Sequence, residues 1–287
     1  MTSSGEAGGL FVGRHQEMAE VNDALDDAMA GHGRLVMLAS EPGIGKTSIA
    51  HELTAHASDL GAKVLGGWCY EREGAPPYWP WVQPIKASVA DAPADQLGTE
   101  IGSAAADIAD LIPEIRQELP DLETPPALDP EPTRFQLFNS ITAFLKTVAQ
   151  PQSLVVVLDD LHWSDTPSLL LLEFLAQKMA ESNVLVIGTY RDVEVTRRHP
   201  LTESLARMSR NASFHRLGLD GLESGDAGEY VRESGGENAS SKMLEAIHTH
   251  TEGYPLFIRS HLAMLSGRSL SLAFAIVGAM LALSSHT

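Results

Sequence analysis

The sequence predicts an α/β fold, with a central parallel sheet flanked by helices and a small C-terminal helical subdomain after it. Apolar, β-branched runs such as 153–158 have the composition of buried parallel strands. Helix-forming stretches separate these runs as far as about residue 220, and only helical patterns follow. Strands that alternate with helices form parallel sheets, whereas consecutive helices pack as a unit of their own.

The strands are expected where apolar residues run without interruption between glycine, proline or polar residues. The expected strands are 34–39, 63–68, 153–158, 183–189 and 214–219. The run 153–158 reads Ser-Leu-Val-Val-Val-Leu and is therefore expected inside the sheet, covered on both faces.

The helices are expected where apolar residues recur every three or four positions. The first helix has four such residues on one face: Met18, Val21, Leu25 and Met29. The other expected helices are about 47–60, 134–148, 168–179, 200–209, 224–233, 240–251 and 255–266.

Region 70–132 is expected to be an insertion of mixed helix and loop. A helical piece around 101–111 lies between two proline-rich parts, which the prolines are expected to break up. These prolines are Pro76, Pro77, Pro80, Pro84 and Pro93 in the first part, and Pro120, Pro125, Pro126, Pro130 and Pro132 in the last.

A glycine-rich segment follows the first expected strand and opens the next helix. Residues 40–47 read Ser-Glu-Pro-Gly-Ile-Gly-Lys-Thr. Gly43 and Gly45 let the backbone curl so that its N–H groups point at an anion. Lys46 adds a positive charge, Thr47 offers a hydroxyl to Mg²⁺, and the positive end of the helix faces the same place. The pattern predicts a nucleoside triphosphate with magnesium as the ligand.

This loop departs from the usual pattern G-x-x-x-x-G-K-[ST] at its first position, which is Ser40. Serine is compatible with the function, because this position ends the strand while Gly43 and Gly45 are expected nearest to the phosphates. An ordinary glycine-rich strand–turn–helix is the alternative, and the strand–helix context disfavours it.

Two carboxylates follow the expected strand 153–158. Asp159 is expected to reach Mg²⁺ largely through the water shell of the metal, and Asp160 to orient or deprotonate the water that attacks the γ-phosphate. A capped turn at the end of a strand is the alternative explanation of this pair. Because aspartate is shorter than the glutamate of many fast ATPases, we expect slow hydrolysis.

Arg191 follows the expected strand 183–189 and is expected to face or sense the γ-phosphate. The alternative is a surface arginine paired with Asp192 or Glu194, because exposed ion pairs are common. His162 is expected to make a supporting hydrogen bond and Trp163 to pack.

The composition restricts the partners and the location. A net charge of −18 argues against broad binding to nucleic acids or to anionic membranes. Cys69 is the only cysteine, which excludes an internal disulfide, and it is expected to be buried. The start of the chain has no signal-peptide pattern, so we expect a cytoplasmic protein. The apolar tail 270–283 is shorter than a membrane span of about 20 residues, so a buried or docking helix is expected and a membrane anchor is the less favoured alternative.

Several segments together resemble those of signal-transduction ATPases with numerous domains (STAND). The resemblance is to the AAA+/P-loop ATPase region (an Orc1-like AAA ATPase domain) of large LuxR-type bacterial transcriptional regulators and of related cyclase-linked proteins. The matching segments are Phe-Val-Gly-Arg at 11–14, the loop 40–47, the aromatic insertion 69–81, Leu-Asp-Asp-Leu-His-Trp-Ser-Asp at 158–165, Gly-Thr-Tyr-Arg-Asp at 188–192 and Gly-Tyr-Pro-Leu at 253–256. They extend over about residues 10–266.

The resemblance implies a P-loop NTPase fold and an ATP/ADP and Mg²⁺ site. Gly13 and Arg14 would lie beside the base and sugar, and Pro255 would contact the nucleotide from the helical subdomain. The phosphate loop would bind through Glu41, Pro42, Gly43, Ile44, Gly45, Lys46, Thr47 and Ser48. The metal would be held by Thr47 and Asp159, and the catalytic residues would be Lys46, Asp160 and Arg191.

The domain organisation then follows. Residues 1–9 are expected to be disordered, 10–220 to form the nucleotide-binding α/β domain, and 221–287 to form the helical lid subdomain. In such proteins ADP holds a closed state, and exchange for ATP opens it for self-association or for a regulatory partner protein. No residues here match the DNA-binding helix-turn-helix of these regulators, so DNA binding is not carried over.

Three functions stay open on the sequence. The first is a slowly hydrolysing ATPase that acts as a regulatory switch. The second is a nucleotide-holding interaction module without significant hydrolysis, which the short side chain of Asp160 favours. The third is a small-molecule kinase with the 70–132 insertion as its substrate pocket, against which no cluster of arginines for a lid is found. An origin-recognition or clamp-loading relative shares the fold, but the acidic composition opposes DNA handling.

Overall fold

The computed structural model describes residues 10–71, 74–92, 102–119, 122, 129–235 and 239–265. The expected disorder at 1–9, the apolar tail 270–283, and Pro93, Pro120, Pro125 and Pro126 lie outside these residues. Within the described part, five parallel strands form one sheet in the order β2-β3-β4-β1-β5. This sheet and its flanking helices confirm the predicted fold class.

The strands agree with the sequence prediction to within two residues at each end. They are β1 (Arg34–Ser40), β2 (Lys63–Trp68), β3 (Leu154–Asp159), β4 (Val184–Arg191) and β5 (Phe214–Gly218). Their residues are buried alternately on the two faces: in β1, Leu35 and Met37 join the large core cluster on one face, and Val36 and Leu38 are buried outside that cluster. A parallel sheet covered on both faces accounts for the continuous apolar runs.

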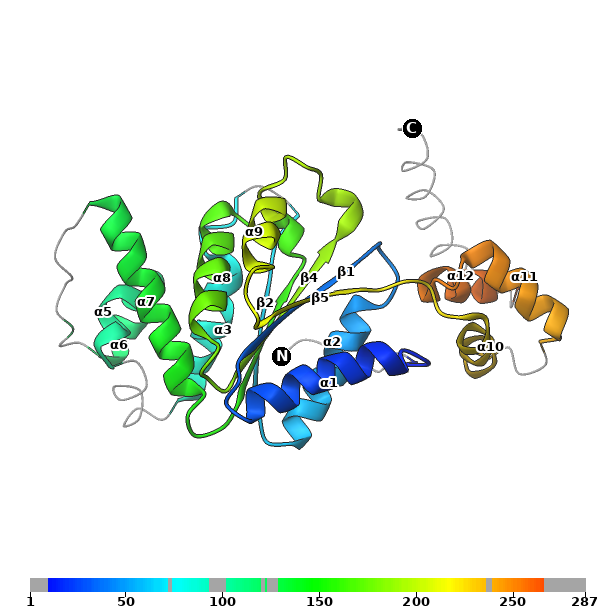
Figure 1. Ribbon diagram of the computed structural model, residues 1–287, viewed down its shortest axis with the longest axis horizontal. Coiled ribbons are helices and arrows are strands. Elements are labelled where there is room, and N and C mark those ends of the chain that lie inside the picture. Colours follow the sequence, from blue (N-terminus) through cyan, green and yellow to red (C-terminus); the bar gives the residue numbers. More distant parts are fainter. Residues whose placement is uncertain are drawn as a thin grey trace. The chain divides into compact units, whose positions relative to one another are not determined.

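Helices cover both faces of the sheet (Figure 1). Helices α1 (His15–Met29) and α2 (Lys46–Asp59) lie on one side, and α3 (Trp79–Asp91), α8 (Thr166–Lys178) and α9 (Pro200–Met208) lie on the other. Helix α7 (Pro130–Val148) packs against α8 and against the short helix α5 (Ala105–Ala109). Short helical turns complete this part of the chain: η1 (Gly102–Ala104), α6 (Ile115–Glu118), η2 (Leu161–Trp163) and η3 (Asp192–Glu194).

Helix α3 corrects the expectation that prolines interrupt its segment. Pro80 lies in the first turn, where its missing N–H has no helical partner to lose, and Pro84 lies inside the helix. The helix is held by its apolar face, on which Trp81 and Ile85 are fully buried in the core. Tertiary packing therefore outweighs the intrinsic cost of Pro84.

Helix α7 begins earlier than expected, at Pro130 rather than at about residue 134. Asp129 precedes it in an extended conformation, and Pro130 occupies the first helical position, for which its fixed φ is suited. Pro130 and Pro132 therefore start a helix, whereas the sequence suggested that they break one up.

The chain divides by its internal contacts into two compact units. Among the described residues, one unit holds those of 18–40 and 49–218 with the sheet, and the other holds 10–17, 41–48, 219–235 and 239–265. In the second unit, α10 (Ser224–Glu233), α11 (Ser241–Thr251) and α12 (Pro255–Leu265) confirm the three expected C-terminal helices. Their core includes Val12, Leu222, Tyr230, Val231 and Ile258.

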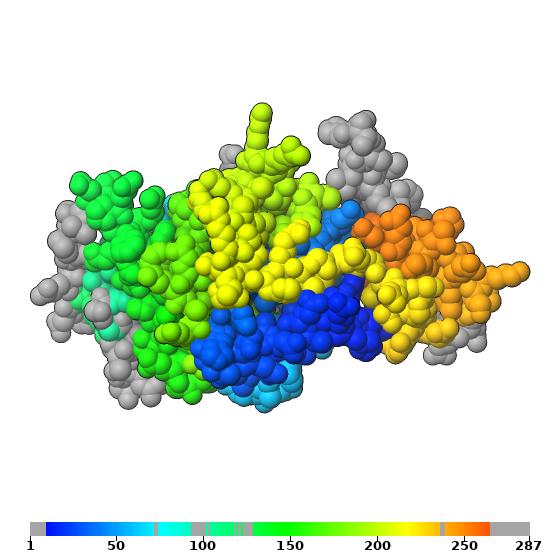
Figure 2. Space-filling view, in the orientation of Figure 1, coloured from blue at the N-terminus to red at the C-terminus, as the bar shows by residue number. Residues whose placement is uncertain are grey.

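Strand β5 forms one edge of the sheet and pairs with β1 alone among the described strands. Its residues His215 and Arg216 are exposed, and Figure 2 shows α9 and β5, in yellow-green and yellow, at the molecular surface. Charged side chains on an edge strand hinder pairing with a second sheet. No helix among the described residues is long and apolar enough to cross a membrane.

Gly67 of β2 is required by the close approach of α3. A Cβ atom at this position would overlap the carbonyl oxygen of Pro80, whereas a Cβ atom at the neighbouring Gly66 would meet nothing within 4 Å. We predict that Gly67→Ala lowers the free energy of unfolding by about 1–3 kcal/mol, because the backbone of α3 has to shift. Urea denaturation measures this change. Gly66→Ala is the matched control, and an equal effect of the two substitutions would contradict the packing described here.

Candidate functional site

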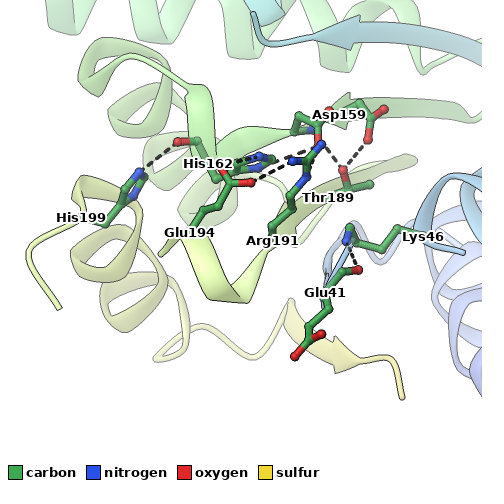
Figure 3. Close-up of polar contacts among 9 residues, drawn as sticks. Glu41, Lys46, Asp159, His162, Thr189, Arg191, Glu194 and His199 are labelled. Atoms are coloured by element: carbon green, nitrogen blue, oxygen red, sulfur yellow. Dashed lines mark hydrogen bonds and ion pairs between the residues drawn. The ribbon is translucent and has the colours of Figure 1, made fainter. Parts of the chain in front are cut away.

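The glycine-rich loop has the backbone conformation of an anion-binding turn. Gly43 and Gly45 have φ values of +83° and +115°, which favour glycine, and α2 begins at Lys46. Lys46 is buried, and its Nζ donates to the backbone carbonyl of Glu41 at 3.1 Å (Figure 3). Thr47 and Ser48 are exposed at the start of the helix. The amides, the ammonium group and the hydroxyls of this loop are the donors that phosphate oxygens require.

Two residues of the entry segment support the loop. Arg14 is buried, donates through Nη2 to the carbonyl of Ile44 at 3.1 Å, and pairs with Glu17 at 2.7 Å. Gly13 has a φ of +68°, and the side chain of Asp226 occupies the space that a Cβ atom would need. Arg14 therefore fixes the conformation of the loop through its backbone.

The start of α12 and the residue before it contact the phosphate loop directly. The Tyr254 hydroxyl donates to the Glu41 carboxylate at 2.9 Å, and the Leu256 N–H donates to the Gly43 carbonyl at 3.3 Å. The Leu256 side chain also lies against Gly43, where a Cβ atom would be 2.8 Å from it. Burial, with Glu41 as the next cause, raises the pKa of Tyr254 to about 12, so the phenol keeps its proton at neutral pH.

A small cavity joins five predicted nucleotide-binding residues. Its walls are Arg14, Ile44, Gly45, Ser48 and Pro255, together with Leu10, Phe11, Val12, Leu222 and Tyr230. Its volume is about 40 Å³, which is close to the space that one water molecule occupies. An adenine ring enters such a cavity only if the helical residues move away from the loop.

The second half of the predicted site lies at the carboxyl ends of β3, β4 and β1. Arg191, the last residue of β4, is the register partner of Ser40, after which the phosphate loop begins. The Thr189 hydroxyl on β4 donates to the Asp159 carboxylate and accepts the backbone N–H of Asp160 at 3.0 Å (Figure 3). A single side chain thus orients both residues of the acidic pair.

Asp160 has a left-handed backbone conformation, with a φ of +56°. This conformation costs free energy in a residue other than glycine, and such residues are frequent at functional sites. Asp160 also forms an ion pair with Arg191: the Arg191 Nε atom lies 3.8 Å from the Asp160 Oδ1 atom. The Asp160 carboxylate therefore has other partners than that of Asp159, which accepts a hydrogen bond from Thr189.

Arg191 is held by carboxylates and by an aromatic ring. Its Nη1 donates to Glu194 at 2.8 Å, and its guanidinium lies 4.8 Å from the centroid of Trp163. Pairing with Glu194 is one of the two alternatives expected from the sequence, whereas Asp192 pairs with Arg216. Trp163 therefore does more than pack, because its ring also contacts the Arg191 guanidinium.

His162 lies between the carboxylates of Asp160 and Glu194. Its side chain is fully buried, with Nδ1 at 3.8 Å from Asp160 and Nε2 at 3.5 Å from Glu194. The backbone carbonyl of His162 lies 2.9 Å from Nε2 of His199, and Nδ1 of His199 accepts the Leu201 N–H at the start of α9. His199 thus carries its proton on Nε2 and connects the acidic turn to α9.

The described residues include no group of three His, Cys, Asp or Glu side chains that could hold a metal on its own. Mg²⁺ is usually bound through one or two carboxylates together with substrate phosphates and water, so Asp159 and the Thr47 hydroxyl are suitable ligand types. Sequence reasoning missed Thr189 and Tyr254 as supporting residues. The signals available were a hydroxyl residue near the end of a strand next to the acidic strand, and a tyrosine adjacent to Pro255.

The sequence pattern of the AAA ATPase domain family matches residues 10–187. This chain therefore belongs to the AAA ATPase domain family, whose members are nucleotide-binding ATPases that bind ATP or ADP with Mg²⁺. An uncharacterized protein of Rhizobium meliloti (strain 1021) is 23% identical over 205 residues, which cover 65% of this chain and 19% of the relative. The chain thus spans about a fifth of the length of that curated relative.

Solved structures with similar folds include a Signal Transduction ATPase with Numerous Domains protein with a tetratricopeptide repeat sensor from Pyrococcus horikoshii. It is 19% identical, with 88% of this chain and 29% of that chain covered and a TM-score of 0.48. Cdc6p from Pyrobaculum aerophilum is 17% identical, with coverages of 93% and 66% and a TM-score of 0.49. A RuvB mutant from Thermotoga maritima is 15% identical, with coverages of 87% and 60% and a TM-score of 0.45. At these identities the likeness concerns the fold alone.

The role of Thr189 is testable with an isosteric substitution. Thr189→Val removes the hydroxyl, leaves the Asp160 N–H without its acceptor and frees the Asp159 carboxylate. We expect the free energy of unfolding to fall by about 1–3 kcal/mol and the Mg²⁺ dependence of ATP binding to weaken. Denaturant unfolding and titration of nucleotide at several Mg²⁺ concentrations measure the two effects. Thr189→Ser keeps the hydroxyl. If Thr189→Ser bound Mg-ATP as poorly as Thr189→Val, this would argue against the role of the two Thr189 hydrogen bonds.

The contact between Tyr254 and Glu41 is testable by hydrogen exchange. Tyr254→Phe removes one hydrogen bond, worth about 0.5–1.5 kcal/mol, so we expect amide exchange in residues 43–46 to become about two- to tenfold faster. Glu41→Gln keeps an acceptor oxygen and is expected to leave exchange near the wild-type rate. Unchanged exchange in Tyr254→Phe would show that this contact does not restrain the loop.

Proposed function

We propose that this chain is a slowly hydrolysing ATPase that acts as a regulatory switch, closed with ADP and open with ATP. The observation that supports this proposal is the pair of hydrogen bonds from Tyr254 and Leu256 to the phosphate loop. A loop that holds phosphates and contacts a helical segment can pass a change at the phosphates to that segment.

We assign binding of the triphosphate to the loop amides and to Lys46. The Lys46 ammonium, which now donates to the Glu41 carbonyl, would turn to a phosphate oxygen that carries a full charge. Thr47 and Asp159 would hold Mg²⁺, which when bound neutralises charge on the β- and γ-phosphate oxygens. The Thr189 hydroxyl keeps the Asp159 carboxylate in one orientation for this task.

Hydrolysis depends on Asp160 and Arg191 in this proposal. Asp160 would orient the attacking water, because its carboxylate has other partners than that of Asp159 and is 28% exposed. Arg191 would leave Glu194 for the γ-phosphate, since a phosphate oxygen competes with a carboxylate for a guanidinium. The γ-phosphate thus decides which partner Arg191 has, and this is a difference between the ATP and ADP states.

The small cavity beside Pro255 supports the same switch. Nucleotide entry requires Leu222, Tyr230 and Pro255 to separate from Ile44 and Gly45, because the space between them is now about 40 Å³. The base would therefore be enclosed by a movable helical segment. This is how a lid couples nucleotide exchange to conformation.

We further propose that the chain acts as the ATPase region of a larger regulator of the signal-transduction class, in which the ATP state favours self-association or a regulatory partner protein. The segments 158–165, 188–192 and 253–256, which resemble the LuxR-type regulators, support this assignment. Transcriptional regulation is part of this proposal and depends on the domains of that larger protein.

A nucleotide-holding module without significant hydrolysis is the second candidate. It is favoured by the ion pairs of Arg191 with Glu194 and Asp160, which keep the arginine on protein carboxylates. Purified protein that carries ADP and releases no phosphate from added ATP would select it. Transfer of phosphate to an added small-molecule acceptor would instead identify a kinase.

The test of the switch uses two substitutions. Lys46→Ala is expected to weaken Mg-ATP binding at least about a hundredfold, because a charge-assisted contact is lost next to several phosphate charges. Asp160→Asn is expected to preserve binding within about threefold and to lower single-turnover hydrolysis at least about a hundredfold. Calorimetry measures binding, and phosphate release measures hydrolysis.

Lys178→Ala and Asp192→Asn are the matched controls, since both side chains are exposed and belong to neither the loop nor the acidic pair. Hydrolysis by Asp160→Asn at the wild-type rate would refute the assignment of the water-orienting role. Tight nucleotide binding by Lys46→Ala would refute the phosphate site itself.

A further inference from the structure

A second cavity, with a volume of about 240 Å³, lies in the unit that holds the sheet. Three segments form its walls: the residues after β2, the start of α3, and the end of η2 with the two residues after it. The lining residues are Cys69, Tyr70, Gly74, Ala75, Trp79, Pro80, Trp163, Ser164 and Asp165. It is smaller than the pockets of about 300–1,000 Å³ that accept drug-sized ligands, so it suits a small molecule.

The cavity lies at the carboxyl ends of β2 and β3, which are neighbours in the sheet. Trp68 ends β2 and pairs in register with Asp159, which ends β3. Ligands of open α/β sheets bind outside the carboxyl ends of strands, because loops from different strands diverge there and leave a crevice. The position of the cavity is therefore one where binding sites form.

Aromatic rings make up much of the wall. Tyr70 and Trp79 lie with their ring centroids 6.0 Å apart, and Trp163 closes another side. The Trp79 Nε1 atom is buried and has no hydrogen-bond partner among the described residues. Because this atom is not exposed to the cavity, the Trp79 ring contributes its apolar atoms to the wall and its N–H does not.

The charge around the cavity is negative. The carboxylate of Asp165 is held by the Ser168 N–H at 2.9 Å and by the Ser168 hydroxyl at 2.5 Å, and it forms part of the wall. Burial is the main cause that raises the pKa of the Cys69 thiol to about 12; the hydrogen bond to Ser164 lowers this pKa, and the negative charges of Asp165, Asp160 and Asp159 raise it. The carboxylate in the wall disfavours an anionic ligand.

A cation already binds to one of these rings. The Arg191 guanidinium lies 4.8 Å from the Trp163 centroid but is not among the residues that line the cavity. The faces of Tyr70, Trp79 and Trp163 carry negative electrostatic potential, which attracts a cation most strongly when water is excluded.

We propose that this cavity binds a small organic cation, an ammonium compound. The aromatic rings and Asp165 receive the ammonium group. This site is separate from the predicted nucleotide contacts, none of which line it. Because Trp163 touches both the cavity and Arg191, a bound cation changes the surroundings of the arginine.

Choline and its neutral carbon isostere, 3,3-dimethyl-1-butanol, are the probes that test the proposal. Binding to the purified full chain is measured by calorimetry or ligand-observed NMR in the absence of nucleotide, so that the result does not depend on the proposed ATPase. We expect saturable choline binding with a Kd below about 10 mM, and binding of the alcohol that is at least about fivefold weaker. Equal binding of the two probes, or no saturable binding of choline, would overturn the proposal.

Substitutions locate the site. Tyr70 is 49% exposed, so Tyr70→Ala is expected to fold normally and to weaken choline binding at least about threefold, whereas Tyr70→Phe keeps the ring and the affinity. Trp68→Ala is the matched control, because Trp68, at the end of β2 and two residues before Tyr70, is 51% exposed and lies outside the cavity lining. An equal loss in Trp68→Ala and Tyr70→Ala would place the cation elsewhere on the surface.

Discussion

The acidic turn after β3 depends on one hydroxyl group, that of Thr189. It accepts the N–H of Asp160 and donates to the carboxylate of Asp159, so two adjacent carboxylates take different orientations. The parallel register of β3 and β4 brings this hydroxyl to the end of the acidic strand. Without it, the left-handed conformation of Asp160 would lose a compensating hydrogen bond, and Arg191, His162 and Glu194 would lose the geometry in which they now meet.

The phosphate loop is restrained from two directions within its own compact unit. Arg14 holds it through the Ile44 carbonyl, and Tyr254 and Leu256 hold it through Glu41 and Gly43. Each contact is an ordinary hydrogen bond of modest net free energy. The free energy of binding a triphosphate can therefore be larger than the free energy that holds the loop in this conformation. A nucleotide-dependent switch requires such a relation, because a loop conformation held too strongly would not change when the ligand binds.

The helices around the proline-rich insertion show where local rules are outweighed. Pro84 argues against a helix at 79–91, yet α3 forms because Trp81 and Ile85 bury fully against the core and Gly67 lets β2 approach its backbone. Pro130 begins α7 instead of ending a loop, since proline at the first helical position loses no hydrogen bond. Pro130 therefore acts through its position at the start of a helix, whereas Pro84 is tolerated because packing outweighs its cost.

The sequence by itself determined the α/β class, the strands to within two residues, and the place of the glycine-rich loop between β1 and α2, because these are local patterns of a few consecutive residues. Only the tertiary structure decided which side chains support them. Thr189 and Asp159 are 30 positions apart and Tyr254 and Glu41 are 213 apart, while the aromatic cavity draws on three separate segments. Such contacts arise from strand register and helix packing, and no local period in the sequence records which distant residues will meet.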